Sequence, residues 1–299
     1  MTLETLRLYC DVVRLRSFSR AAAAGQVSQS AASQAIQQLE AELEVQLIDR
    51  TKRPFAVTPE GRAYLEACRA LLQTHEKALA DLAALRGQVS GTVRVAAIYS
   101  VGLHDMSRHV QRFTALHPHA KVRLDYLHPQ KVVEAVVEDE ADLGVLSYPE
   151  AKRGLAVIPL WSEPMVFVCP PGHRLARRRA VAAADLNGEP FVAFDRDLRI
   201  RKAIDRCLRQ HDARVNGIME FDNIETIKQA IAIGAGVSIL PRPTILKEVG
   251  NRTLAAVPLA MPELVRPLGI IHRRGKLFPP TIARFLELLR QPEEGPTET

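Results

Sequence analysis

The chain has 299 residues, of which 47% are hydrophobic and 25% are charged, and its formal net charge is +6 at pH 7. This composition is typical of a globular protein, and the length allows two or three domains. No run of about 18 apolar residues occurs, and the first ten residues lack the basic and apolar regions of a signal peptide. We therefore expect a cytoplasmic protein without a membrane partner.

The four cysteines are far apart in the sequence, and no two of them form a Cys-x-x-Cys pair: Cys10, Cys68, Cys169 and Cys207. This spacing argues against a zinc site or a redox pair. We interpret them as buried reduced thiols, with a redox-sensing thiol as the alternative. His117 and His119 are separated by a proline in a surface turn, so we expect no metal there either.

Residues 3–15 carry apolar side chains near helical spacing, which predicts a first helix behind the segment that follows. A short Ala-rich helix is expected after Ser17, and Gly25 is expected to end it, because glycine tolerates a left-handed turn. A second helix is expected after the N-cap residue Ser28. Its inward face would be formed by Ala32, Ile36, Leu39 and Leu43. Two short helices at a tight turn are typical of a helix-turn-helix.

The outward face of the second helix carries short polar and amide side chains, which can bond base edges and phosphates in a DNA major groove. The basic loop 49–54 is suited to contact phosphates as a wing. The alternative is an ordinary solvated helical hairpin. Residues 1–91 have 11 Lys and Arg against 10 Asp and Glu, a difference of +1, so charge alone gives little support. The predicted DNA-binding residues are Ser17, Gln29, Ser30, Ser33, Gln34, Gln37, Arg50, Thr51, Lys52 and Arg53.

Thr58 and Pro59 predict the start of a long helix that runs to about Arg86. A helix this long with one apolar seam needs a partner, so we predict a dimer that places two recognition helices on a two-fold operator. Packing of the seam onto its own domain is the alternative. The seam has nearly three heptads and consists of Leu65, Cys68, Leu72, His75, Leu79 and Leu82.

Several motifs in register resemble the N-terminal domain of LysR-type transcriptional regulators. They are Ser17-Phe18-Ser19-Arg20-Ala21-Ala22, Val27-Ser28-Gln29, Leu39-Glu40, Arg50-Thr51 and Thr58-Pro59-Glu60-Gly61. The chain departs from the family pattern at Gly25 (usually Leu), Ser30 (Pro), Gln34 (Arg), Gln37 and Gln38 (basic) and Ile48 (Phe). Fewer basic residues weaken the attraction of this helix for phosphates. Specificity then depends more on amide contacts and on the wing.

The remainder, from about 92 to 290, alternates predicted strands and helices. Strands at 92–98, 121–127 and 143–147, with helices at 103–116 and 132–138, make a βαβαβ unit with a parallel sheet. Further strands are expected at 165–169, 190–194, 215–221, 237–240 and 264–272, with helices at 199–211, 224–233 and 281–290. We predict two α/β subdomains joined by crossovers near 161–164 and 262–266.

This arrangement resembles the effector-binding domain of LysR-type regulators, which is similar to periplasmic solute-binding proteins. The resemblance covers nearly the whole chain and implies an α + α/β fold. Residues 1–58 would form a winged helix-turn-helix, 59–90 a dimerising linker helix and 91–291 the effector-binding domain. In that domain, 91–161 with 266–291 would be subdomain one and 162–265 subdomain two. The tail 292–299 is expected to be disordered.

A ligand is expected between the two subdomains, at the carboxyl ends of strands. A serine at a helix start can hold a carboxylate beside free backbone N–H groups, or it can be a plain N-cap. An arginine at another helix start can pair with an anionic effector or be solvated. The resemblance implies a small metabolite, often an anion. The predicted effector-binding residues are Tyr99, Ser100, Ser147, Tyr148, Arg199 and Thr226.

These features predict a sequence-specific DNA-binding transcription regulator whose promoter binding and activation respond to a small anionic metabolite. The expected partners are double-stranded promoter DNA, the effector, other copies of the chain as a dimer and then a tetramer, and RNA polymerase as a further candidate. No cofactor or enzyme activity is expected, because the sequence has no nucleophile elbow, phosphate loop or convincing nucleophile–base pair. The alternatives are a solute carrier and an enzyme fused to a DNA-binding head.

Overall fold

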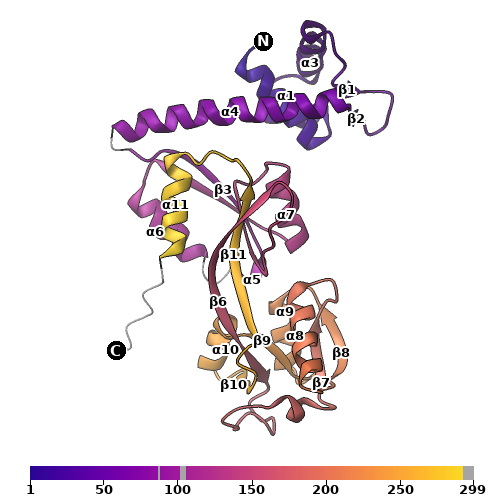
Figure 1. The fold of residues 1–299 in the computed structure, drawn as a ribbon, viewed down its shortest axis with the longest axis vertical. Helices are drawn as coiled ribbons and strands as arrows, with labels where there is room; N and C mark the ends of the chain where they lie inside the picture. Colours follow the sequence, from indigo (N-terminus) through magenta and orange to yellow (C-terminus); the bar gives the residue numbers. More distant parts are fainter. Residues whose placement is uncertain (87, 102–105, 292–299) are drawn as a thin grey trace. The chain divides into compact units, whose positions relative to one another are not determined.

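The structure, a computed structural model, describes residues 1–86, 88–101 and 106–291 and divides into two compact units (Figure 1). Residues 1–89 and 277–280 form the first unit, and residues 90–276 and 281–299 form the second. Among the described residues, no helix is long and apolar enough to span a membrane. The predicted tail 292–299 lies outside the described residues.

The first unit is a small helical domain with one hairpin. It contains α1 (Leu3–Leu15), α2 (Phe18–Ala24), α3 (Gln29–Leu43), the antiparallel strands β1 (Ile48–Asp49) and β2 (Ala56–Val57), and α4 (Pro59–Leu85). Ser17, Ser28 and Thr58 cap α2, α3 and α4, because each side chain accepts the backbone N–H three residues later. The apolar faces of the helices meet in a core around Tyr9 and Ile36, which confirms the predicted inward face of α3.

The turn between α2 and α3 differs from the prediction at Gly25. Gly25 has φ −84°, and the next residue, Gln26, takes the left-handed conformation at φ 55°. The predicted left-handed role of Gly25 is therefore wrong. A β-carbon at Gly25 would lie 3.4 Å from the carbonyl oxygen of Ala21, which is an ordinary contact. The space for a β-carbon and the negative φ show that this position does not require glycine.

The predicted heptad seam of α4 divides into two parts. Leu65 and Cys68 are buried in the core of the first unit, where α4 packs against α1. Leu79 and Leu82, further along the helix, are 54% and 59% exposed. The interpretation of the whole seam as a dimer surface is wrong for its first part, because those residues complete their own domain. The second part leaves apolar side chains in solvent.

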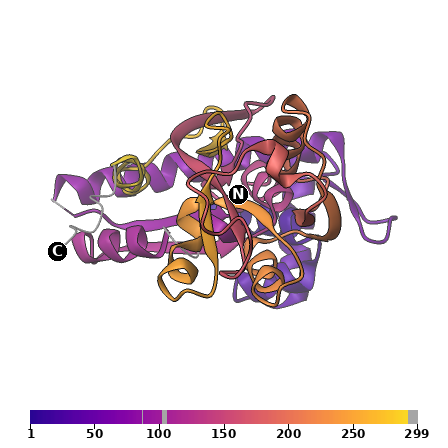
Figure 2. The same cartoon turned by 90° about the horizontal axis from the view of Figure 1, so that it is seen from below.

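The second unit has two lobes, and the first lobe is built on a parallel sheet. β3 (Gly91–Ala97) pairs with β4 (Ala120–Tyr126) and β5 (Leu143–Ser147), and α5 (Tyr99–Val101), α6 (Ser107–Leu116) and α7 (Pro129–Val137) lie in the connections. α11 (Pro280–Arg290) packs on α6, where the rings of Phe113 and Phe285 are 5.0 Å apart. These two helices lie on one side of the strands and α7 on the other (Figures 1 and 2). The predicted βαβαβ unit is confirmed, although residues 103–105 of the helix predicted over 103–116 lie outside the described residues.

The buried carboxylate of Asp142 joins three segments of the first lobe through ion pairs. Asp142 lies 2.7 Å from Nη2 of Arg94 and 2.9 Å from Nζ of Lys276. Burial raises the pKa of Asp142, but the hydrogen bonds and charge of Arg94, with Lys276, outweigh it and hold that pKa below its usual value. These ion pairs join β3, the segment before β5 and the segment after β11 of the same lobe.

The second lobe has its own parallel pair of strands and its own core. β7 (Pro190–Phe194) pairs with β8 (Asn216–Phe221), next to α8 (Arg199–Gln210) and α9 (Ile224–Ala232). The core includes Phe167, Phe191 and Leu240. The prediction missed several elements because they are too short to show a period. They are the helices η2 (Ala183–Leu186), η3 (Arg242–Ile245) and α10 (Leu246–Gly250), and the strand β10 (Ala255–Pro258).

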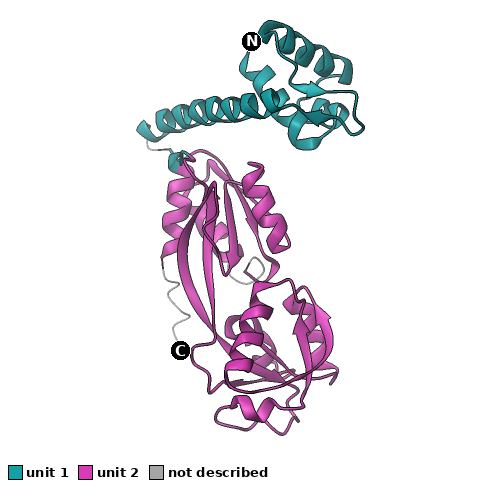
Figure 3. Ribbon diagram, turned by 45° about the vertical axis from the view of Figure 1, so that its right-hand side comes forward, with its two compact units in different colours: residues 1–89, 277–280 teal, residues 90–276, 281–299 magenta. Residues whose placement is uncertain are grey.

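Two long antiparallel strands, β6 (Leu155–Cys169) and β11 (Val265–Arg273), run through both lobes (Figure 3). β9 (Ser238–Pro241) and β10 pair with β6, and the sheet order is β10-β6-β11-β5-β3-β4. The chain passes between the lobes at the predicted positions near 161–164 and 262–266, but along the continuous strand β6 and at the start of β11. The strand predicted at 165–169 is only the end of β6, because Pro159 and Pro164 interrupt the strand pattern of its first part.

Candidate DNA interface and effector cleft

The predicted DNA-binding residues of the first unit lie on α3, on the hairpin and at the start of α2. Gln29, Ser30, Gln34 and Gln37 are exposed on α3, and Ser33 is half-buried beside them. Since the other face of α3 is in the core, these side chains form a polar surface open to a ligand. Ser17 is half-buried, because its hydroxyl caps α2.

Glu40 ties the hairpin to α3. One carboxylate oxygen accepts the backbone N–H groups of Leu47 and Ile48, at 2.8 and 2.9 Å, and the other lies 2.7 Å from Nη1 of Arg50. The Arg50 guanidinium also lies over the ring of Phe18, 5.7 Å from its centroid. Arg50, predicted as a phosphate contact, thus has an internal partner. The prediction missed the role of Glu40, although the Leu39-Glu40 motif marked the position.

The tip of the hairpin carries the remaining predicted wing residues. Thr51 donates its backbone N–H and its hydroxyl to Asp49, at 3.0 and 2.5 Å, and these bonds hold the pKa of Asp49 below its usual value. Lys52 lies 3.7 Å from the same carboxylate, and Arg53 is exposed. Lys52 and Arg53 therefore present positive charge to solvent at the end of the wing.

A cavity of about 520 Å³ lies between the two lobes of the second unit. Its wall includes Tyr99 and Ser100 after β3, Ser147 at the end of β5, and Arg199 at the start of α8. The structure thus brings together four of the six predicted effector residues. A volume of this size suits a small metabolite.

The other two predicted effector residues do not line the cavity. The Thr226 N–H and hydroxyl donate to the side-chain oxygen of Asn223, at 2.9 and 3.0 Å, in the N-cap of α9. The Tyr148 hydroxyl donates to the Val265 carbonyl oxygen at 2.9 Å, and burial raises the pKa of Tyr148 to about 12. Tyr148 follows the same strand as Ser147, but it takes φ 51° and packs against the second-lobe core. It therefore connects elements of the second unit rather than facing a ligand.

Arg266, which the prediction missed, is the most buried charged side chain of the cavity wall, at 1% exposure. Its Nε donates to Glu163 at 2.7 Å, and its Nη1 donates to the hydroxyl of Ser100 at 2.8 Å. Nη2 lies against the same carboxylate but makes no hydrogen bond of good geometry to a described residue. A buried guanidinium with unused N–H capacity beside a cavity can bind an anionic group.

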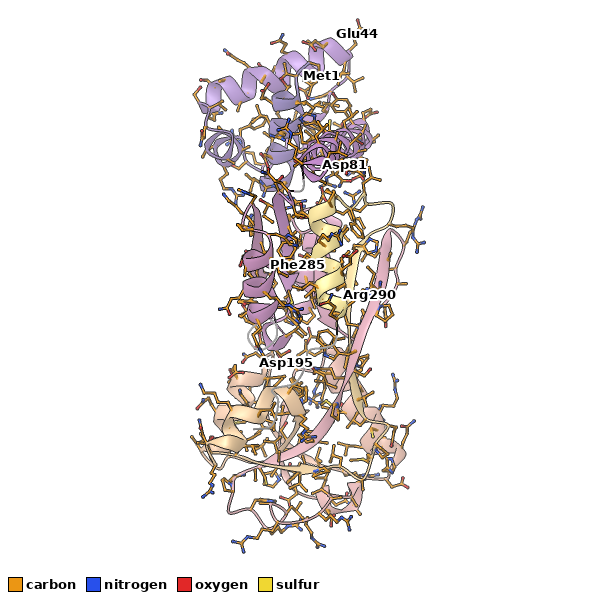
Figure 4. The ribbon with its side chains drawn as sticks, turned by 90° about the vertical axis from the view of Figure 1, so that its left-hand side faces the viewer. Met1, Glu44, Asp81, Asp195, Phe285 and Arg290 are labelled. Carbon is orange, nitrogen blue, oxygen red and sulfur yellow. The ribbon has the colours of Figure 1, made fainter. Side chains whose placement is uncertain are left out.

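The rim of the cavity carries both signs of charge. Arg199 donates to the carbonyl oxygen of Tyr148 at 2.8 Å and pairs with Glu150, so its charge is partly matched. Lys152 and Lys202 also line the cavity, as do Glu134, Asp197 and Asp222. Asp195 lies on the side of the second lobe that faces the first (Figure 4), and its pKa is raised, first by burial and then by neighbouring carboxylates. Near Ser100, the positive charge of the wall comes from Arg266, which donates a hydrogen bond to the Ser100 hydroxyl.

Two family models match the chain. Residues 3–62 match "Bacterial regulatory helix-turn-helix protein, lysR family", and residues 86–292 match "LysR substrate binding domain". The chain belongs to the LysR family. This membership confirms the predicted helix-turn-helix head and two-subdomain α/β domain, and it confirms a transcription regulator rather than an enzyme.

Individual LysR-family relatives align over nearly the whole chain. YeiE of Escherichia coli K12, an uncharacterized HTH-type transcriptional regulator, is 29% identical over 287 residues, 96% of each chain. A full-length OxyR variant from Pseudomonas aeruginosa has a TM-score of 0.77 at 22% identity and covers 97% of this chain and 93% of that one. The CcmR regulatory domain of Synechocystis PCC6803, in complex with 2-PG, has a TM-score of 0.62 at 25% identity and covers 67% and 96%.

Proposed function

We propose that this LysR-family regulator binds two-fold promoter DNA as a dimer and changes its DNA binding when a small anionic metabolite enters the cleft. The observation that carries the proposal is the buried Arg266 behind Ser100, in the wall of the cavity between the two lobes. The regulator would act in the cytoplasm, on the gene next to its operator.

The cleft supports an anionic ligand. A carboxylate or phosphate at Ser100 would accept a hydrogen bond from the serine hydroxyl and reach the N–H groups of Arg266. These are charge-assisted donors on a buried side chain. The 2-PG in the CcmR regulatory domain supports the same kind of ligand here. Tyr99, Ser147 and Arg199 complete the proposed contacts. Tyr148 and Thr226 would not touch the ligand; they would hold Val265 and the start of α9 in place.

The α3 surface supports base contacts in the major groove. Gln29 and Gln34 can each bond an adenine edge bidentately, and Ser30, Ser33 and Gln37 can reach bases or phosphates. Lys52 and Arg53 would bind phosphates from the wing, with Thr51 and Ser17 nearby in support. Arg50 would contribute by holding the hairpin through Glu40.

The second part of α4 supports dimerisation. Leu79 and Leu82 are more than half exposed, and burying the exposed part of one leucine contributes about 1 kcal/mol. Two chains joined along this helix would present two α3 surfaces to a two-fold operator. We retain the division into residues 1–58, 59–90 and 91–291, and a tetramer and contact with RNA polymerase belong to the same proposal.

A footprint of the purified full-length protein on DNA upstream of its own gene and the divergent neighbouring gene tests DNA recognition. Near-physiological salt and excess nonspecific competitor suppress sequence-independent binding. Gln34→Ala should cost about 1–3 kcal/mol on the protected site and little on random DNA. Gln38→Ala is the matched control, because Gln38 is exposed on the same helix and bonds Glu42 at 3.3 Å. Equal losses on both DNAs, or from both variants, would contradict base recognition by Gln34.

Binding of 2-PG and other small carboxylates and phosphates, followed by calorimetry, tests the cleft. Ser100→Ala should weaken the binding of an anion about tenfold, which is roughly one hydrogen bond to a charged group. Ser107→Ala on α6 is the control, because Ser107 is exposed and does not line the cavity. An effector that binds equally to both variants, or that changes neither footprint nor transcription, would refute the proposed site or its coupling.

A further inference from the structure

A second group of ligand-type side chains lies on the second lobe, outside the cavity wall. Cys207 and His211 are one helical turn apart at the C-terminal end of α8, and Glu263 lies in the segment before β11. The Cys207 Sγ, a His211 ring nitrogen and a Glu263 carboxylate oxygen all lie within 4.8 Å of one another. Among the residues that the structure describes, no other three His, Cys, Asp or Glu side chains bring their ligand atoms within 4.8 Å of one another.

The distances between these side chains fit the coordination of one metal ion. Oε1 of Glu263 is 3.7 Å from Sγ of Cys207 and 2.6 Å from Nε2 of His211. Around a tetrahedral Zn²⁺, a thiolate sulfur and a carboxylate oxygen lie about 3.5 Å apart, and an imidazole nitrogen and a carboxylate oxygen about 3.3 Å. The first pair is therefore already at its bound separation. The second pair needs to open by less than about 1 Å, which exposed side chains can do.

Access and charge also suit a cation. Cys207 is buried and forms the floor of the group, while His211 and Glu263 are exposed to the solvent from which an ion arrives. The carboxylate of Glu263 lies 2.6 Å from Nε2 of His211, so the group already holds a negatively charged oxygen ligand beside the imidazole. The C-terminal end of α8 adds the negative end of a helix dipole.

We propose that Cys207, His211 and Glu263 bind one Zn²⁺ ion. Thiolate, imidazole and carboxylate are the three side-chain groups that zinc takes in proteins, and water completes the tetrahedron. On binding, the Cys207 thiol loses its proton to solvent and the sulfur binds the metal. The neutral His211 ring moves its proton from Nε2 to Nδ1 through solvent, so that Nε2 gives up its hydrogen bond to Glu263 and binds the ion.

The ion would connect two parts of the second lobe that serve the cleft. It would join the C-terminal end of α8, whose first residue Arg199 lines the cavity, to the segment that leads three residues later to Arg266. Zinc binding would therefore restrain the entry of β11 against α8. This zinc site does not depend on the proposed DNA or effector binding.

The test is a zinc titration of the full-length protein without a histidine tag, in competition with a chromophoric zinc chelator. We expect one Zn²⁺ per chain and one proton released per ion. Co²⁺ in place of Zn²⁺ should give a thiolate-to-metal charge-transfer band and the intense visible absorption of a tetrahedral site. These readouts do not depend on DNA binding.

His211→Ala and Glu263→Gln alter exposed side chains and should leave the fold intact. Removal of an outer-shell partner alone costs about 10–100-fold in metal affinity, so loss of either ligand should weaken Zn²⁺ binding by more than about 100-fold. His173→Gln is the matched control, because His173 is also paired with a glutamate, Glu189 at 3.2 Å, outside any three-ligand group found in the described chain. Its affinity for Zn²⁺ should equal that of the unchanged protein.

Three results would overturn the proposal. The first is no stoichiometric Zn²⁺ binding, and the second is binding that survives both ligand variants. The third concerns Met261, whose sulfur lies 3.7 Å from that of Cys207. Because a thioether favours Cu⁺, tighter binding of Cu⁺ than of Zn²⁺ that is lost in Met261→Leu would replace zinc by copper.

Discussion

Replacement of Glu40 by alanine should loosen the wing without unfolding the rest of the protein. The carboxylate of Glu40 is the acceptor for the backbone N–H groups of Leu47 and Ile48 and the partner of Arg50. Glu40→Ala removes all three interactions. The matched control is Glu42→Ala on the same helix, because the side chain of Glu42 is 43% exposed, against 11% for Glu40, and accepts no backbone N–H in the described chain.

The magnitude follows from the contacts. The two N–H groups belong to the buried residues Leu47 and Ile48, and each costs about 1 kcal/mol when left without an acceptor, at the low end of the range for buried groups. Loss of the partly exposed Arg50 pair adds about 0.5–1 kcal/mol. We therefore expect the free energy of local opening at the hairpin to fall by about 2–3 kcal/mol, and amide exchange there to rise about 30- to 150-fold.

Hydrogen exchange with mass spectrometry on peptides that cover residues 44–50 measures this opening directly in the full-length protein. Exchange in the β3–β5 sheet should stay unchanged in both variants. If the 44–50 peptide exchanged equally in Glu40→Ala, Glu42→Ala and the unchanged protein, the carboxylate would not hold the hairpin. DNA affinity should also fall for specific and random DNA alike, because we propose that the wing binds phosphates.

Gly61→Ala should lower the stability of the first unit by about 2–3 kcal/mol in thermal unfolding, because its β-carbon would meet a backbone oxygen at 2.2 Å. Gly172→Ala, with no atom within 4 Å of its β-carbon, should change nothing. Asp142 has a lowered pKa, so its ion pairs stabilise the fold above the unfolded pKa of about 3.9 and are lost as pH falls through the folded pKa. Asp142→Asn should be less stable at pH 7 and lose less stability on acidification, and unchanged acid unfolding would contradict this. Leu82→Arg should yield monomers in sedimentation velocity, whereas Leu116→Arg, at a 58% exposed leucine on α6, should not.

Sequence patterns predict the elements whose signals are local. The caps at Ser17, Ser28 and Thr58 lie within three residues of the groups that they bond, so they were visible in the sequence. The long helix and the parallel βαβαβ unit have clear periods for the same reason. Short elements such as η3 and β10 have four residues each, which is too few to show a period.

The parts of the site that sequence patterns miss depend on contacts between distant residues. Arg266 and Ser100 are 166 positions apart, and Arg266 and Glu163 are 103 positions apart. Arg199 was predicted at the cleft by its helix start, but its pairing with Glu150 arises only in the folded lobes. Tyr148 was predicted in the cleft because it follows the same strand as Ser147. Its own left-handed backbone conformation directs it away from the cavity.

The pairing of β6 with β11 makes the second lobe an insertion. Glu163 and Arg266 are direct Cα partners in this ladder, so the chain leaves the first lobe and returns to it at one place. Closely spaced ends are the condition under which one domain tolerates another inside it. Residues 164–265 can thus be regarded as a cassette. Exchanging that cassette between family members would replace one wall of the cleft and keep the other wall, the linker helix and the DNA-binding head, which offers a route to chimaeric regulators with new effectors.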